Sequence, residues 1–135
     1  MNINGPIVLI EDDADEAFIL CELINEISPA NKVIVIADSR KAVQVLSSCE
    51  KPFIIFSSIN LAALNGFQLR EQILVNTALA RKCSPYIFYA ASSNDEMLRR
   101  VYDVKASGYF HDIADYNQLG QTLSGIIDYW VKCAV

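Results

Sequence analysis

Short apolar runs, each too brief to be a helix, recur along the chain, and a longer segment with apolar residues at helical spacing follows each one. The runs cover residues 6–10, 32–36, 53–56, 86–90 and 107–111. Alternation of this kind is typical of a parallel sheet whose strands are joined by crossover helices. We therefore expect a doubly wound α/β fold with a five-stranded parallel sheet and helices on both faces. Periodicity does not give the order of the strands.

The run 53–56, Phe-Ile-Ile-Phe, is the most apolar in the chain, and we expect it to be a central strand buried on both faces. The first expected helix ends at Ser28-Pro29, because proline cannot continue a helix. Asp38 is a plausible N-cap for the second. The other helices are expected to begin at Gly66, within 92–95 and near Asp115.

Size and charge restrict the function further. The chain has 135 residues, 53% of them hydrophobic, which predicts one domain with a core of about residues 5–132 and no output domain. The formal charge of −5 argues against binding to nucleic acid. No basic leader and no apolar stretch of about 18 residues is present, so we expect no membrane contact and a cytoplasmic location. The four cysteines have no zinc-site spacing.

In an open parallel sheet, ligands bind beyond the carboxyl ends of the strands. The residues at those ends are therefore the candidates for function. They are Glu11, Asp12 and Asp13 after the first strand, 57–60 after the third, 90–92 after the fourth and 111–113 after the fifth.

At these strand ends the chain resembles the receiver domain of bacterial two-component response regulators, and in particular the single-domain, chemotaxis-type members. The matching pieces, in the right order, are IVLIEDDADEAFIL, INLAALNGFQLREQI, SPYIFYAASSNDEM and KASGYFHD. The resemblance implies a flavodoxin-like (βα)5 fold. It also implies an acid pair that holds Mg²⁺, a phosphoacceptor aspartate, a Ser/Thr that bonds the phosphate and a lysine that pairs with it.

Carried over to this chain, the resemblance gives Glu11 and Asp12 as the acid pair. Ser58 stands at the phosphoacceptor position, in Ser58-Ile-Asn-Leu-Ala-Ala-Leu-Asn-Gly66. Ala90 replaces the Ser/Thr, and Asp112 replaces the lysine. A serine cannot form an acyl phosphate and does not chelate Mg²⁺ as an anion. Reading Ser57 as the acceptor supplies no carboxylate either. We therefore expect a pseudo-receiver that small phosphodonors do not label.

The acids leave a second possibility. Glu11, Asp12 and Asp112 are expected to approach one another with no lysine nearby, and like charges at close range raise the pKa of at least one member. With the backbone carbonyl of Asn60 they could form a cation site. An all-acid cluster without supporting contacts binds Mg²⁺ weakly or not at all, so we expect no cofactor.

Enzymatic readings are disfavoured. A grouping of Ser58, His111 and Asp112 would be needed for a hydrolase, but adjacent strand residues point to opposite faces and no GxSxG motif surrounds the serine. For a flavin-binding protein, the acids after the first strand would repel a phosphate. We therefore expect that this protein is not an enzyme.

The expected function is signal transduction through protein contact, with a histidine kinase, another regulator or an output protein as partner. By the resemblance, Tyr109 matches the aromatic switch residue and marks a recognition face made by the last two helices and the strand between them. A weak homodimer through this face, or a monomer, is expected. The candidate aromatic anchors on this face are Tyr86, Tyr89, Tyr102, Tyr116, Tyr129 and Trp130. We expect many of them to be core residues instead. The alternative is a receiver fold switched by a cation or a small ligand at the acidic cluster.

Overall fold

The computed structural model of the protein describes residues 1–111 and 113–133. Its centre is a parallel sheet of five strands in the order β2-β1-β3-β4-β5. The strands are β1 (Ile7–Ile10), β2 (Val33–Ile36), β3 (Ile54–Ser58), β4 (Tyr86–Tyr89) and β5 (Gly108–Phe110). The expected doubly wound α/β fold is thereby confirmed.

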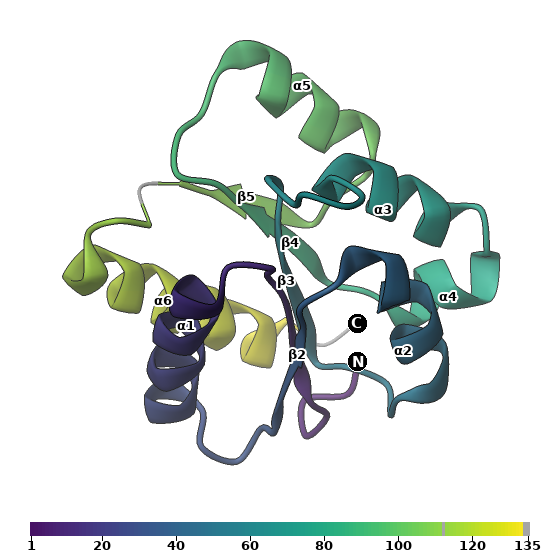
Figure 1. Cartoon of the computed structure of the whole chain (residues 1–135). Coiled ribbons are helices and arrows are strands. Elements are labelled where there is room, and N and C mark those ends of the chain that lie inside the picture. The colour runs from purple at the N-terminus through teal and green to yellow at the C-terminus, as the bar shows by residue number, and fades with distance from the viewer. Residues whose placement is uncertain (112, 134–135) are drawn as a thin grey trace.

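Helices cover both faces of the sheet (Figure 1). They are α1 (Ala14–Ile27), the 3₁₀ helix η1 (Ser39–Lys41), α2 (Ala42–Ser48), α3 (Gly66–Leu74), α4 (Thr77–Lys82), α5 (Asp95–Asp103) and α6 (Tyr116–Lys132). Two apolar clusters, one on each side of the sheet, form the core. One contains the inward residues of α1 and α6, and the other contains those of α2, α3, α4 and α5.

Strand β3 lies in the middle of the sheet, between β1 and β4. All of its residues are buried, as the uninterrupted apolar run 53–56 predicts. An apolar side chain on either face of such a strand leaves water and contributes roughly 1.5–3 kcal/mol. The most apolar segment therefore fixes the position of the residue at its carboxyl end, Ser58.

The segment between β3 and β4 differs from the expectation of a single helix. It contains two helices, α3 and α4, because Asn76 adopts an extended conformation and its side chain accepts a hydrogen bond from the Leu79 N–H. An asparagine that caps a new helix in this way ends the preceding one. Asp38 caps the segment after β2 as expected, although that segment begins as the 3₁₀ helix η1 before it continues as α2.

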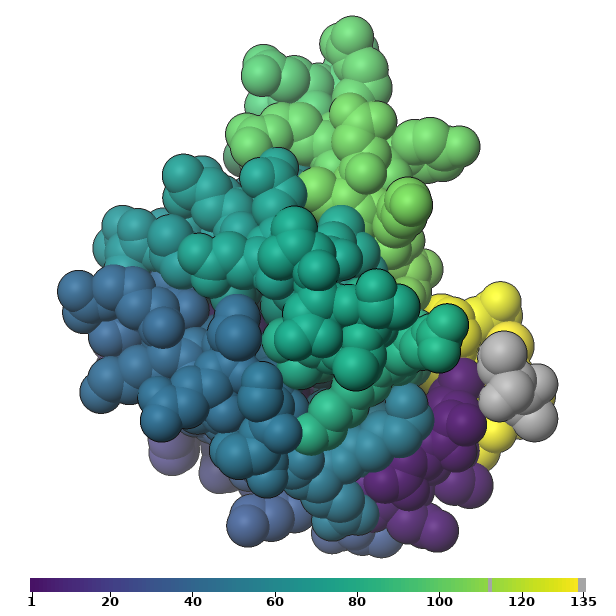
Figure 2. Space-filling model, turned by 90° about the vertical axis from the view of Figure 1, so that its right-hand side faces the viewer, coloured from purple at the N-terminus to yellow at the C-terminus, as the bar shows by residue number. Residues whose placement is uncertain are grey.

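The reversal of strand order lies between β1 and β3, which are adjacent in the sheet although β2 separates them in sequence. The connections leaving these two strands run to opposite faces, and the edge beyond them is where ligands bind in folds of this type. In Figure 2, α5 stands out from the body of the molecule next to this edge. Among residues 1–111 and 113–133, none of the helices has the length and apolar composition needed to span a membrane.

Candidate functional site

The candidate site lies at the carboxyl edge of the sheet. Glu11 and Asp12 directly follow β1, Ser58 ends β3, Ala90 follows β4, and His111 follows β5. The parallel arrangement brings these chain positions to one edge, as the sequence predicts. Asp112, whose carboxylate was expected to approach the acid pair, lies outside the described residues.

Glu11 is directed into the protein rather than toward the edge. Its side chain is buried, one carboxylate oxygen accepts a 2.8 Å hydrogen bond from the Tyr89 hydroxyl, and the other accepts from the Asp13 N–H at 3.1 Å. Burial raises the pKa of Glu11, and the two hydrogen bonds oppose that shift. Burial, with the adjacent Glu11 carboxylate, also raises the pKa of the Tyr89 hydroxyl. Both oxygens of Glu11 are therefore used by donors of the protein itself.

The two acids that follow have other partners. Asp12 accepts a 2.8 Å hydrogen bond from the backbone N–H of Ala62, which lies in the loop after β3. Asp13 caps α1 by accepting from the Glu16 N–H at 3.0 Å. The three consecutive acids thus have three separate tasks, and Asp12 is the one that faces the edge.

Ser58 occupies the end of β3 and is buried, with a relative exposure of 6%. Its hydroxyl oxygen accepts a hydrogen bond from the Asn60 N–H at 3.2 Å. The neighbouring Ser57 is fully buried and donates to the carbonyl of Ser58 at 3.1 Å. Ser57 is therefore closed to solvent, which removes it as an alternative acceptor of a group from solution.

On the far side of Ser58, the position after β4 has no polar side chain. Ala90 is buried, and its methyl group belongs to the core cluster under α3 and α5. Tyr109 in β5 is half-buried, and its hydroxyl lies 3.1 Å from the Ser92 carbonyl and 3.4 Å from the Met97 sulfur. Tyr109 is thus bonded to the β4–α5 loop rather than to the residue at position 90.

The β3–α3 loop is held in one conformation from several directions. Asp12 holds Ala62, and the Ser39 hydroxyl both donates to the Leu64 carbonyl and accepts from the Leu64 N–H. At its end, Gly66 donates to the Ile59 carbonyl at 2.9 Å. A Cβ at position 66 would lie 2.5 Å from the Ser58 carbonyl oxygen, so only glycine allows this close approach.

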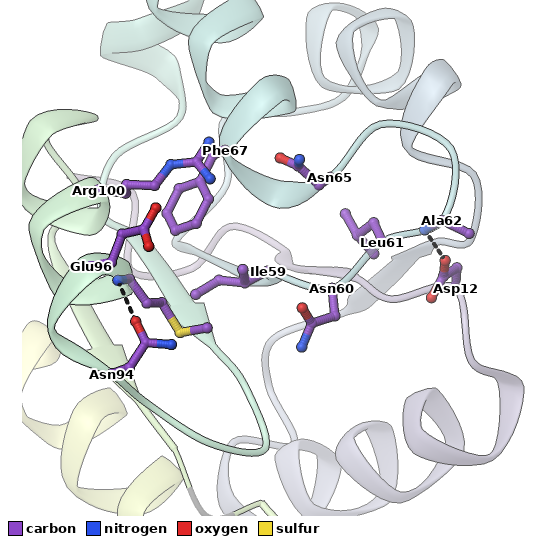
Figure 3. Close-up of a pocket in the computed structure, with 11 residues that line it drawn as sticks. Asp12, Ile59, Asn60, Leu61, Ala62, Asn65, Phe67, Asn94, Glu96 and Arg100 are labelled. Atoms are coloured by element: carbon purple, nitrogen blue, oxygen red, sulfur yellow. Dashed lines mark hydrogen bonds between the residues drawn. The ribbon is translucent and has the colours of Figure 1, made fainter.

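A groove of about 630 Å³ lies between this loop and α5 (Figure 3). Its apolar lining is Ile59, Leu61, Phe67 and Met97, and its polar lining is Asp12, Asn60, Asn65, Asn94, Glu96 and Arg100. The volume lies within the range of about 300–1,000 Å³ that is typical of small-ligand sites. Sequence reasoning placed Asp12 and Asn60 at this edge but missed the wall that α5 provides.

The described residues contain no cluster of three or more His, Cys, Asp or Glu side chains that could hold a metal ion. The oxygens of Glu11 are engaged by Tyr89 and Asp13, and one oxygen of Asp12 by Ala62. In the expected ligand set of Glu11, Asp12 and the Asn60 carbonyl, both carboxylate oxygens of Glu11 are therefore engaged, whereas one carboxylate oxygen of Asp12 accepts no hydrogen bond from a described residue.

The candidate aromatic anchors divide into two groups. Tyr86 and Tyr89 are fully buried in β4 and belong to the core, because this strand has neighbours on both sides and helices on both faces. Tyr102, Tyr116 and Tyr129 are exposed, and Trp130 is half-buried against the α1 and α6 cluster. Only the residues of α5 and α6 remain available as surface anchors.

No family model matches the chain. Among curated proteins, it is 22% identical over 130 residues to the probable methanogenesis regulatory protein FilR2 of Methanothrix harundinacea, covering 93% of this chain and 83% of that protein.

Solved structures are more similar in shape than in sequence. The phosphorylated cyanobacterial phytochrome response regulator RcpA matches with a TM-score of 0.85 and 22% identity, covering 98% of this chain and 96% of that one. A response regulator receiver domain from Rhodospirillum rubrum matches with a TM-score of 0.83 and 20% identity over 96% of each chain. The Mn²⁺-bound form of response regulator Rcp1 matches with a TM-score of 0.79 and 20% identity, over 98% and 97%. The fold is therefore the flavodoxin-like fold of these receiver domains.

Proposed function

We propose that this protein is a receiver-type module of a two-component network that signals in the cytoplasm by contact with a protein partner, independently of phosphorylation. The observation that carries the proposal is Ser58, a buried serine at the end of β3 whose hydroxyl accepts the Asn60 N–H. The partner is a histidine kinase, another regulator or an output protein. No chemical step on a substrate is part of the proposal.

The chemistry of phosphoryl transfer supports this choice. An acyl phosphate forms only on a carboxylate, and stabilisation of the transferring group needs a cation and hydrogen-bond donors placed around it. Position 58 has a hydroxyl and position 90 has a methyl group. Position 112, where the resemblance places a lysine, has an aspartate.

The contacts of the acid pair support the same conclusion for the metal. A divalent cation at Glu11 would compete with the Tyr89 hydroxyl and the Asp13 N–H for the carboxylate oxygens, and Ser58 offers no third carboxylate. We propose that Mg²⁺ and Mn²⁺ bind weakly or not at all, although one of the similar structures is Mn²⁺-bound. The same contacts disfavour the alternative of a switch controlled by a cation or small ligand at the acidic cluster.

The proposal is tested by NMR of the ¹⁵N-labelled protein, first with Mg²⁺ and then with beryllofluoride, which mimics an aspartyl phosphate only where a carboxylate holds it. We expect no saturable change in the signals of residues 58–60 and 90. Saturable Mg²⁺ binding without a beryllofluoride response would favour the cation-controlled alternative.

A variant separates the roles of the changed positions. Ser58→Asp restores the carboxylate and leaves Ala90 and Asp112 as they are. We expect that acetyl phosphate does not label it, because the hydroxyl and the lysine are still absent. Robust labelling of this variant, measured by intact-protein mass spectrometry, would show that position 58 alone blocks phosphorylation.

A further inference from the structure

The groove between the β3–α3 loop and α5 has charged side chains at both of its ends (Figure 3). At one end the Arg100 guanidinium lies over the ring of Phe67, 4.3 Å from its centroid. At the other end is the carboxylate of Asp12, held by Ala62. Between them lie the apolar side chains of Ile59 and Met97 and the exposed carboxamide of Asn60. Glu96 lines the groove beside Arg100, whereas at the Asp12 end none of the described residues that line the groove is positively charged.

The walls of the groove are fixed by hydrogen bonds of their own. Asn65 and Gln68 form a reciprocal capping box at the start of α3, and Asn94 caps α5 by accepting from the Met97 N–H at 2.8 Å. A wall that is already ordered loses little conformational entropy when a partner binds. The groove is thus prepared to accept a ligand without rearrangement of the loop.

Asn60 differs from the other asparagines of the groove because it caps no helix. Its carboxamide has no hydrogen-bond partner among the described residues. It presents one acceptor and two donors to the groove, and a peptide bond offers the complementary donor and acceptor. This side chain is suited to pair with the backbone of an extended segment.

The Asp12 end of the groove determines which type of side chain a bound segment would place next to it. Asp12 lines the groove, Glu11 precedes it and Asp13 follows it in the sequence, and none of the three forms a salt bridge with a described residue. The whole chain has a formal charge of −5. Charge complementarity at an interface favours the approach of a basic group and opposes an acidic one.

We propose that this groove binds an extended segment of a protein partner, with an apolar side chain over Met97 and Ile59, backbone bonds to Asn60, and a lysine or arginine at Asp12. The proposal rests on the proposed function, partner binding, and names the chemistry of the partner. The surface lies on the β3–α3 loop and the first turns of α5, separate from the exposed aromatic residues of α6.

The test uses the whole protein and a phage library of random heptapeptides. Selection is followed by synthesis of the enriched peptides and titration into ¹⁵N-labelled protein. We expect enriched sequences with an apolar residue near a lysine or arginine, and saturable shifts confined to residues 59–65 and 94–100. Failure to enrich any sequence overturns the proposal.

Three variants make the assignment specific. Asp12→Asn keeps an oxygen for the Ala62 N–H but removes the charge, and we expect two- to fivefold weaker binding, the range of an exposed ion pair. Asp128→Asn, an equal change of charge on an exposed position of α6, leaves the affinity unchanged. We expect Asn60→Ala to weaken peptide binding more than Asp12→Asn does. Equal affinities for wild type and Asp12→Asn would overturn the role of the basic residue.

Enriched peptides whose shifts fall on the surface of α6 would overturn the groove as the site while leaving partner binding intact. Labelling by acetyl phosphate or a response to beryllofluoride would instead contradict the proposed function and leave the peptide result unaffected. The two failures are therefore distinguishable.

Discussion

Replacement of Tyr89 by phenylalanine tests the contact that most distinguishes this site. The variant keeps the ring in the core and removes only the hydroxyl that donates to Glu11 at 2.8 Å. A hydrogen bond to a charged group contributes about 1.5–3 kcal/mol, so we expect Tyr89→Phe to lower the free energy of unfolding by that amount at pH 7. Urea unfolding followed by the fluorescence of Trp130 measures it.

The pH dependence of this loss follows from the raised pKa of Glu11. Because burial raises that pKa above its ordinary value of 4.5, the folded state binds the proton more tightly than the unfolded state. As the pH rises from about 4.5 through the folded-state pKa, deprotonation of Glu11 lowers the free energy of unfolding. At pH values below this range, Glu11 is protonated in both states and this loss is absent. Removal of the Tyr89 hydroxyl raises the pKa of Glu11 further, so the variant loses more stability over this range. Below it, we expect the difference to fall to about 1 kcal/mol, the value of a neutral hydrogen bond.

Tyr86 supplies a matched control on the same strand. Its side chain is also fully buried, and its hydroxyl lies near that of Ser57 without forming a hydrogen bond of ordinary geometry. We expect Tyr86→Phe to leave the stability unchanged or to increase it by roughly 1 kcal/mol, because an unpaired buried hydroxyl is costly. In a Glu11→Gln background, the pH dependence of the Tyr89→Phe effect should vanish. A loss for Tyr89→Phe no larger than that for Tyr86→Phe, or one that is independent of pH, would refute the reasoning.

Further predictions concern the loop, the buried cation and the thiols. Gly66→Ala should destabilise the protein by about 1–3 kcal/mol in thermal melts, because the new Cβ would meet the Ser58 carbonyl. Gly125→Ala is the matched control: its new Cβ would have nothing within 4 Å, and the variant should stabilise α6 by about 0.5–1 kcal/mol. Arg70→Lys should lower the free energy of unfolding in urea by about 1–3 kcal/mol. The buried guanidinium donates to the carbonyls of both Val104 and Lys105 at 3.1 Å, and an ammonium group does not reproduce this pair of hydrogen bonds. An unchanged urea midpoint would contradict this role. Burial raises the pKa of the Cys83 thiol to about 11. At pH 8 a thiol reagent should therefore modify Cys83 only after denaturation, which peptide mass mapping can verify. Rapid modification of Cys83 in the folded protein would contradict its burial.

Much of the fold followed from local patterns. The apolar runs and helical periodicities gave the strands, the helix after each strand and the caps at Asp38 and Ser28-Pro29, since each depends on neighbours in the sequence. The split into α3 and α4 was missed. Asn76 stands in an otherwise helical stretch, and only its extended conformation shows that it ends one helix and caps the next.

The candidate site was predicted less completely. The residue types at positions 11, 12, 58 and 90 were readable from the sequence, and so was the edge where they meet. The partners of these side chains were not, and the burial of Tyr86 and Tyr89 could not be separated from exposure at an interface. A polar-tipped aromatic at the end of an apolar strand was the one signal that could have suggested a buried partner for Glu11.

The residue types alone limit the chemistry that the carboxyl edge of the sheet can supply, because a serine at position 58 and an alanine at position 90 have the same functional groups in any fold. What the acids contact depends instead on the tertiary structure. Tyr89 and Glu11 are 78 positions apart in the chain, and Ala62 and Asp12 are 50 apart. Contacts of such separation depend on the tertiary fold, which brings the carboxyl ends of β1, β3 and β4 to one edge of the sheet, and they turn one acid into the core and another toward the groove.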